Sequence, residues 1–350
     1  MIRSKIAGVG MYVPKDVYTN NDLTRYMDTN DAWIQERTGI KERRYAKRLD
    51  ETTTTMGIEA ATTAIERAGI TPQDIDFIIF ATLSPDYYFP GCGVLVQREM
   101  KMKEVGALDI RNQCSGFLYA LSVGDQFIRG GMYKNILVIG SEKHSFGLDF
   151  STRGRNISVI FGDGAGAVVL QPATIHEQGI LSTHLHSDGE SAEVLAMYNP
   201  GTHGNHWANG HEVADFDDAE IGEAFMSHNM IDNAQNFPNM DGQTVFKKAV
   251  VKMPEVVMEA LNANNLTTSD IDLLIPHQAN LRISQMVQKQ LKLPDHKVYN
   301  NIQKYGNTTA ASIPIALCEA WEEGKIKQGQ LLCLTSFGSG FTWASALIRW

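Results

Sequence analysis

Hydrophobic and polar positions follow the same pattern at two places in the chain. Residues 59–79 read EAATTAIERAGITPQDIDFII, and residues 255–275 read EVVMEALNANNLTTSDIDLLI. In each copy, apolar positions at helical spacing lead into a polar turn with Thr and Asp and then into a short apolar run. Each copy therefore predicts an amphipathic helix, a turn and a buried strand.

A second pair of segments repeats at nearly the same separation. Residues 135–141 (NILVIGS) and residues 330–336 (QLLCLTS) each predict a buried strand after a helix and a Gly/Lys turn. Buried strands that alternate with helices favour mixed, largely parallel sheets that are covered on both faces. We expect one layered α/β body built by duplication, with halves at 1–175 and 176–350.

Residues 187–243 break this pattern. They are rich in Asn, Gly, His and acidic residues, which favours an insertion or lid within the second half. His203 and His206 form an HxxH pair, but loop spacing without a fixed helix or strand gives no coordination geometry. We predict a solvated loop here and no metal site.

Composition narrows the class of protein. The chain is 43% hydrophobic and 20% charged, as globular proteins are, and its formal charge of −9 argues against a dedicated nucleic-acid binder. No apolar run approaches the roughly 18 residues that cross a bilayer, and the N-terminus lacks the apolar stretch of a signal peptide. We expect a cytoplasmic protein with no nucleic-acid or membrane partner.

Cys114 is the candidate nucleophile. It lies in residues 108–121 (LDIRNQCSGFLYAL), where an apolar strand passes through a polar turn into a helical pattern. The positive end of the helix dipole would lower the pKa of the thiol and favour the thiolate. The alternative is a small buried hydrophobe, which is the only interpretation for Cys92, Cys318 and Cys333. No CxxC pair occurs, so all four are predicted to be free thiols.

Two further polar residues occupy positions where α/β sheets carry function. His277, in residues 275–282 (IPHQANLR), directly follows the second copy's apolar strand. Asn307, in residues 305–314 (YGNTTAASIP), lies in a turn that the repeat makes equivalent to the Cys114 turn. Pseudo-twofold placement predicts that Cys114 and Asn307 face each other.

Two glycine-rich stretches complete the candidate site. Residues 162–167 (GDGAGA) precede an apolar run instead of opening a helix, so a dinucleotide site is disfavoured. In residues 337–343 (FGSGFTW), glycines could let backbone N–H groups converge on a developing oxyanion.

Six motifs in order resemble the β-ketoacyl-acyl carrier protein synthase III family of the thiolase superfamily, along essentially the whole chain. They are WIQERTGIKERR at 33–44, CSGF around Cys114, FGDGAGA at 161–167, PHQANLR at 276–282, YGNTTAASIP at 305–314 and the terminal FGSGFTWASALIRW. The resemblance implies a five-layered α-β-α-β-α thiolase-like fold, a homodimer and no cofactor.

The resemblance also implies the chemistry and its residues. Cys114 would be acylated by an acyl-CoA, and His277 and Asn307 would stabilise the enolate of a decarboxylating malonyl thioester. Backbone N–H groups of Cys114 and of the turn Gly338, Ser339 and Gly340 would bind the oxyanion. The positions that match CoA and pantetheine contacts are Trp33, Arg37, Arg155, Phe246, Ala279 and Asn280. A patch for an acyl carrier protein would comprise Lys247, Lys248, Lys252, Arg282 and Lys289, and Phe89 would border the acyl pocket.

This chain departs from the family pattern at several of these places. Asn112 and Gln113 replace small residues before the nucleophile, and Asn156, Gln243 and Ser339 are further departures. They keep open a specialised condensing or acyl-transferring enzyme of secondary metabolism. From the chain order Cys, His, Asn alone, a papain-like cysteine hydrolase is another alternative, and a noncatalytic scaffold is a third. The duplication argues against the hydrolase.

Overall fold

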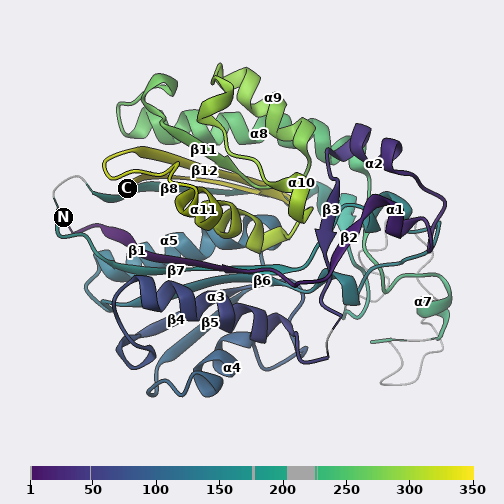
Figure 1. The fold of residues 1–350 in the computed structure, drawn as a ribbon, viewed down its shortest axis with the longest axis horizontal. Helices are drawn as coiled ribbons and strands as arrows, with labels where there is room; N and C mark the ends of the chain where they lie inside the picture. Colours follow the sequence, from purple (N-terminus) through teal and green to yellow (C-terminus); the bar gives the residue numbers. More distant parts are fainter. Residues whose placement is uncertain (1, 48, 176–177, 203–224, 227) are drawn as a thin grey trace.

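Two β-sheets with helices between and outside them make up the structure, a computed structural model that describes residues 2–47, 49–175, 178–202, 225–226 and 228–350 (Figure 1). The first sheet has the order β1-β7-β6-β4-β5. Its strands are β1 (Ser4–Tyr12), β7 (Gly164–Pro172), β6 (Ile136–Glu142), β4 (Phe77–Ala81) and β5 (Gly106–Ile110). β5, β4 and β6 are parallel, whereas β7 and β1 pair antiparallel.

The second sheet has the order β11-β12-β13-β8. Its strands are β11 (Leu273–Pro276), β12 (Leu331–Gly338), β13 (Thr342–Arg349) and β8 (Gly179–Ser187). The order β4-β6-β7-β1 of the first sheet recurs here with the same strand directions, and the place of β5 is taken by a single parallel bridge between Val298 and Leu274 of β11. Both sheets are therefore mixed, with a larger antiparallel share than the repeats predicted. The short link from β12 to β13 leaves no room for a crossover helix, so these strands must pair antiparallel.

Two helices fill the space between the sheets. α5 (Gly116–Arg129) and α11 (Ser312–Glu322) share one apolar core with residues from both sheets. α3 (Thr53–Arg67) and α4 (Cys92–Glu99) cover the outer face of the first sheet. α8 (Gly242–Ala263) and α9 (Leu281–Leu291) cover the outer face of the second sheet (Figure 1).

The repeated Thr and Asp residues explain why both copies fold alike. Thr71 and Asp74 form a reciprocal capping box, as do Thr267 and Asp270. The second Asp of each copy then receives a backbone N–H from the start of the neighbouring strand. Asp76 accepts from Asn135, and Asp272 accepts from Leu331. The same local bonds therefore start the helix-to-strand turn and fix the next strand in both halves.

A group of short elements lies beside one end of the sheets. It includes β2 (Val17–Thr19), α1 (Asn20–Leu23), α2 (Asp31–Thr38), β3 (Glu42–Arg44), α6 (Arg155–Ser158) and α10 (Ile302–Tyr305). Several of these share a small apolar cluster with Ile34 and Ile40 at its centre. α2 is thereby held next to α9, at the rim of the cavity described below.

Only the ends of the predicted insertion belong to the described residues. β9 (Leu195–Ala196) pairs antiparallel with β10 (Asn239–Met240), and α7 (His228–Asp232) lies between them in sequence. Residues 203–224, including the HxxH pair, lie outside the described part, so the lid stays a prediction.

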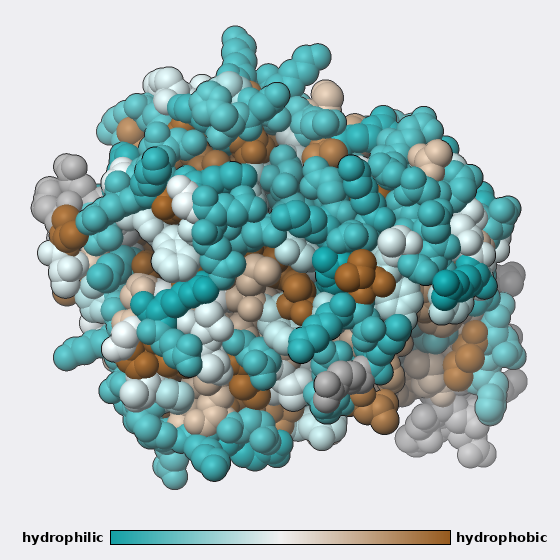
Figure 2. Space-filling view, viewed as in Figure 1, coloured by the Kyte–Doolittle hydropathy of each residue, from teal (hydrophilic) through white to brown (hydrophobic). Residues whose placement is uncertain are grey.

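The face shown in Figure 2 is mostly hydrophilic, with apolar residues in small groups. Among the described residues, no helix combines the length and the apolar character that would let it cross a membrane.

Candidate active site

The three predicted polar residues line one cavity of about 690 Å³. Cys114 comes from the 3-10 turn Gln113–Ser115 before α5, His277 follows β11, and Asn307 precedes the 3-10 turn Thr309–Ala311 before α11. All three side chains are buried. The structure thus brings together residues that are far apart in the sequence, at the ends of the two central helices.

Backbone amides surround the sulfur of Cys114. The backbone N–H groups of Cys114 itself and of Ser339 lie next to the thiol and favour its thiolate form. Ser339 lies in the turn between β12 and β13, as the glycine-rich pattern predicted. Two converging N–H groups beside a nucleophile form an oxyanion hole when an acyl group occupies the sulfur.

Burial, however, raises the pKa of the Cys114 thiol to about 12, and the nearby Glu142 carboxylate acts in the same direction. The prediction of a lowered pKa is therefore wrong. The loss of solvation for the thiolate exceeds the opposing effect of the two backbone N–H groups.

His277 presents one ring nitrogen to the cavity. Its Nδ1 lies 2.6 Å from Ser312 Oγ, which also accepts the backbone N–H of Gln278 at 3.3 Å. A hydroxyl that accepts this N–H can donate its own proton to Nδ1, which leaves the imidazole proton on Nε2. Nε2 has no hydrogen-bond partner among the described residues. Burial lowers the pKa of His277 to about 3, so the ring is neutral and Nε2–H is a free donor.

Asn307 presents its carboxamide nitrogen. Its Oδ1 accepts the backbone N–H of Thr309 at 2.8 Å, which fixes the orientation of the amide. The backbone of Asn307 is held from both sides, because its N–H donates to Ile160 and its carbonyl accepts from Gly162. Nδ2 has no partner in the described part of the chain and is left to face the cavity. His277 and Asn307 therefore supply two donors to one space.

Gly338 sets the approach of the terminal turn to Cys114. A Cβ at position 338 would lie 2.5 Å from Cys114 Cβ and 3.2 Å from its sulfur. We expect Gly338→Ala to lower the rate of Cys114 acylation by roughly a hundredfold, because the turn must move away from the sulfur. Intact mass spectrometry of the acyl-enzyme over time would measure this rate. Gly189→Ala is the matched control, since a Cβ there meets nothing within 4 Å; equal rates for both variants would contradict the expectation.

Most residues predicted to hold CoA and pantetheine also lie at this cavity. Trp33, Arg37, Phe246, Ala279 and Asn280 line it. The guanidinium groups of Arg37 and Arg155 lie 4.5 and 5.3 Å from the Trp33 ring centroid, so Arg155 is adjacent although it is not a lining residue. Asn280 caps α9 and donates to the carbonyl of Arg37 at 2.9 Å. Its side chain therefore also fixes α9 against α2.

The predicted carrier-protein patch is only partly brought together. Lys247 and Arg282 line the cavity. Lys248 pairs with Asp188 at 3.7 Å, and Lys252 pairs with Glu255 at 2.9 Å, while Lys289 lies near the end of α9.

Phe89 does not line the cavity of this chain and is 81% exposed. Gly340 follows Ser339 in the terminal turn and is likewise outside the lining.

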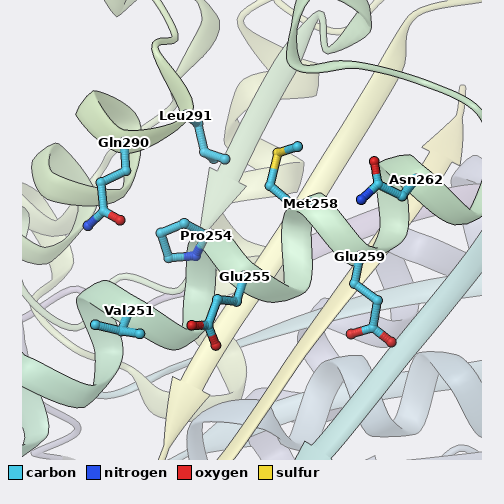
Figure 3. Close-up of a pocket in the computed structure, with 8 residues that line it drawn as sticks. All are labelled: Val251, Pro254, Glu255, Met258, Glu259, Asn262, Gln290 and Leu291. Atoms are coloured by element: carbon cyan, nitrogen blue, oxygen red, sulfur yellow. The ribbon is translucent and has the colours of Figure 1, made fainter.

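A second depression, of about 630 Å³, lies on the outer surface between α8 and α9 (Figure 3). It is lined by Val251, Pro254, Met258 and Leu291 together with carboxylates and amides. Glu259 there accepts from the rings of His184 and His186. Because its lining residues include no nucleophile, the depression is not an acyl-transfer site.

Two buried residues at the site were not predicted. Ser312 lies within the YGNTTAASIP motif but was not singled out. His144 lies just beyond β6, and its Nε2 is 2.6 Å from Thr309 Oγ1. A histidine just past the carboxyl end of a buried strand is the same signal that singled out His277, and it could have identified His144.

Known proteins match this chain over its whole length. Residues 108–189 and 261–350 match the families described as 3-oxoacyl-[acyl-carrier-protein] synthase III and its C-terminal region. The β-ketoacyl-[acyl-carrier-protein] synthase III of Aquifex aeolicus is 43% identical over 99% of both chains. Its counterpart from Granulibacter bethesdensis is 44% identical over all of both chains.

Solved structures agree with these relatives. The crystal structure of the synthase III from Aquifex aeolicus superposes with a TM-score of 0.86 over 99% of this chain and 100% of that one. The priming β-ketosynthase of the R1128 polyketide pathway is 30% identical, with a TM-score of 0.84, over 99% of this chain and 95% of that one.

Fold and relatives together define an acyltransferase of the condensing-enzyme class, with a mixed α/β fold. More narrowly, the chain belongs to the β-ketoacyl-[acyl-carrier-protein] synthase III family of fatty acid biosynthesis. The papain-like hydrolase and the noncatalytic scaffold are therefore set aside.

Proposed function

We propose that this enzyme joins an acyl group from acyl-CoA to a malonyl thioester in two half-reactions at the Cys114 cavity. A single observation carries this assignment. One buried space holds a thiol under two backbone N–H groups and, facing it, two side-chain N–H donors with no partner in the described chain. A nucleophile and a separate pair of donors suit a reaction that makes two different oxyanions.

In the first half-reaction, the Cys114 sulfur attacks the carbonyl carbon of the acyl-CoA. The new carbon–sulfur bond forms, the bond to the CoA sulfur breaks, and CoA leaves as a thiol with the proton of Cys114. The N–H groups of Cys114 and Ser339 hold the oxyanion while the bonds exchange.

In the second half-reaction, the malonyl thioester loses carbon dioxide. Its carbon–carbon bond breaks and the electron pair moves onto the thioester carbonyl as an enolate. His277 Nε2–H and Asn307 Nδ2–H stabilise that oxygen. The enolate carbon then attacks the acyl-cysteine, the carbon–sulfur bond breaks as the β-ketoacyl product forms, and the Cys114 thiolate takes up a proton from solvent. No cofactor takes part, because both thioesters are substrates.

The rim of the cavity suits a nucleotide thioester. Trp33 offers an aromatic face for adenine, and Arg37 and Arg155 next to it can pair with phosphates. Phe246, Ala279 and Asn280 also line the cavity, and the pantetheine arm would pass along them. We assign the carrier-protein patch to Lys247 and Arg282 at the rim, with Lys248, Lys252 and Lys289 farther along the two helices.

We infer a homodimer. Tyr87, Tyr88, Phe89 and Phe146 are all more than half exposed, although Tyr88 contacts the ring of Phe225 at 5.3 Å. Their segments meet, since Lys143 N–H donates to Ser84 Oγ at 2.9 Å. The edge strand β5 has an unpaired side, which a second copy could extend. Phe89 would then close the acyl pocket of the partner.

We also infer a five-layered thiolase-like fold that arose by duplication, with halves at 1–175 and 176–350, and a cytoplasmic enzyme. The matching strand orders and the paired capping boxes support the duplication.

A specialised enzyme of secondary metabolism is the second candidate, favoured by Asn156, Gln243 and Ser339 at the site. The synthase III of Aquifex aeolicus is 43% identical to this chain, and the polyketide priming enzyme is 30% identical.

A panel of acyl-CoAs from two to twelve carbons tests this function. We expect some chain lengths to acylate Cys114, giving the mass increase of the acyl group, and then to yield β-keto product with malonyl-carrier protein at a higher kcat/KM than with malonyl-CoA. Acylation without condensation on either donor would favour an acyltransferase of secondary metabolism. No adduct at any length would refute the proposed function.

A further inference from the structure

A second buried histidine lies behind the site. His144 opens the 3-10 turn His144–Phe146 that follows β6, and it is 7% exposed. Its ring packs against Phe161, with centroids 4.7 Å apart. Its Nε2 lies 2.6 Å from Thr309 Oγ1, a contact between residues 165 positions apart in the chain.

Thr309 is the residue that orients the Asn307 carboxamide. Its backbone N–H occupies Asn307 Oδ1, and the Thr309 backbone is left-handed, with φ of 49°. Left-handed geometry is unfavourable for a β-branched residue and persists only where surrounding contacts hold it. His144 supplies such a contact on the side chain, and the N–H of the next residue, Ala310, lies close to the Glu142 carboxylate.

We propose that His144 is a positioning residue for Asn307, acting through Thr309. The inference rests on the proposed function, in which Asn307 must present N–H and not oxygen to the enolate. While Thr309 is held, its N–H occupies Oδ1 and leaves Nδ2 toward the cavity. Without the His144 contact, the turn can relax and the carboxamide can rotate, which would place an acceptor against a developing negative charge.

His144 does not act as a charge. Burial lowers the pKa of His144 to about 3, so the imidazole stays neutral at working pH. Its ring therefore offers Thr309 a neutral hydrogen-bond partner, and its contribution is geometric. Its effect should be confined to the half-reaction that uses Asn307, since acylation depends on the separate N–H groups of Cys114 and Ser339.

Two variants remove the contact from opposite sides. His144→Leu replaces the ring by an apolar side chain, and Thr309→Val removes only the hydroxyl. We expect each to lower the condensation rate by about ten- to a hundredfold while the acylation rate changes less than about twofold. The double variant should be no slower than the worse single one, because both changes break one contact. Thr309→Ser, which retains the hydroxyl, should restore most of the rate.

The measurement separates the half-reactions. Acylation is followed by intact mass after mixing with acyl-CoA, and condensation by β-keto product from the preformed acyl-enzyme and malonyl-carrier protein. His184→Leu is the control, because this histidine contacts Glu259 and Ser182 outside the cavity. If His144→Leu misfolds, Thr309→Val and His144→Gln carry the test.

Three results would overturn the positioning role: unchanged condensation in His144→Leu and Thr309→Val, equal losses in both half-reactions, or additive losses in the double variant. A wild-type enzyme that forms no β-keto product from any acyl-CoA would instead reject the proposed function, and the positioning role with it. The two failures are thus distinguished by the wild-type measurement.

Discussion

Cys114→Ala should abolish the acyl-enzyme and lower β-keto product formation by about 10⁴-fold or more. The reason is that both half-reactions pass through the Cys114 sulfur, and removing a catalytic nucleophile costs rates of this order. The structure limits other effects of the substitution, since Ala at 114 retains the backbone N–H and the buried Cβ next to Gly338. Intact mass after incubation with acyl-CoA measures the adduct directly.

Cys333→Ala is the matched control. Cys333 is also a fully buried free thiol, but it lies within β12 and packs in the apolar core under α8 and α9. The Cys333→Ala variant should be acylated at Cys114 as the wild type is. Acylation that persists in Cys114→Ala, or that disappears in Cys333→Ala, would reject Cys114 as the nucleophile.

His277→Ala should separate the two half-reactions. We expect it to slow condensation by about 10² to 10³-fold, the usual effect of losing one oxyanion donor, while Cys114 still becomes acylated. Decarboxylation of the malonyl thioester, followed as released carbon dioxide, should fall in parallel with product. Because burial lowers the pKa of His277 to about 3, the wild-type condensation rate should show no inflection from this residue near pH 6.5.

Ser312→Ala is a milder change at the same group than His277→Ala. It retains the imidazole and removes only the hydroxyl 2.6 Å from Nδ1, so the proton is no longer directed to Nε2. Its condensation rate should lie between those of wild type and His277→Ala. Loss of acylation in His277→Ala, to the same extent as condensation, would mean that this residue serves both steps.

Much of the fold was accessible from the sequence because its determinants are local and occur twice. The Thr and Asp residues at 71–74 and 267–270 form capping boxes within four residues, and Asp76 and Asp272 each bind the start of a strand 59 positions further on, so the repeated letters predict repeated structure. The antiparallel share of the sheets was underestimated, since it depends on which strands a short link joins.

The site was predicted as a set of residues but not in its electrostatics. The repeat correctly indicated that the turns at Cys114 and Asn307 meet, because equivalent strand ends converge across the two sheets. Whether the pKa of the Cys114 thiol is raised or lowered depends on how much water the packed protein excludes, which no local pattern encodes. The position of His144 just past a strand end could have singled out the residue, but its contact with Thr309, 165 positions away, depends on packing that no local pattern encodes.

The shared middle layer restricts how substrates can enter. α5 and α11 each pack against residues of both sheets in one continuous core, so the two sheets cannot move apart without breaking that core. If the cavity takes long thioesters as proposed, they would have to enter along the rim between α2 and α9. Turnover would then be governed by loops and side chains at the mouth, while the catalytic groups keep fixed spacing from one cycle to the next.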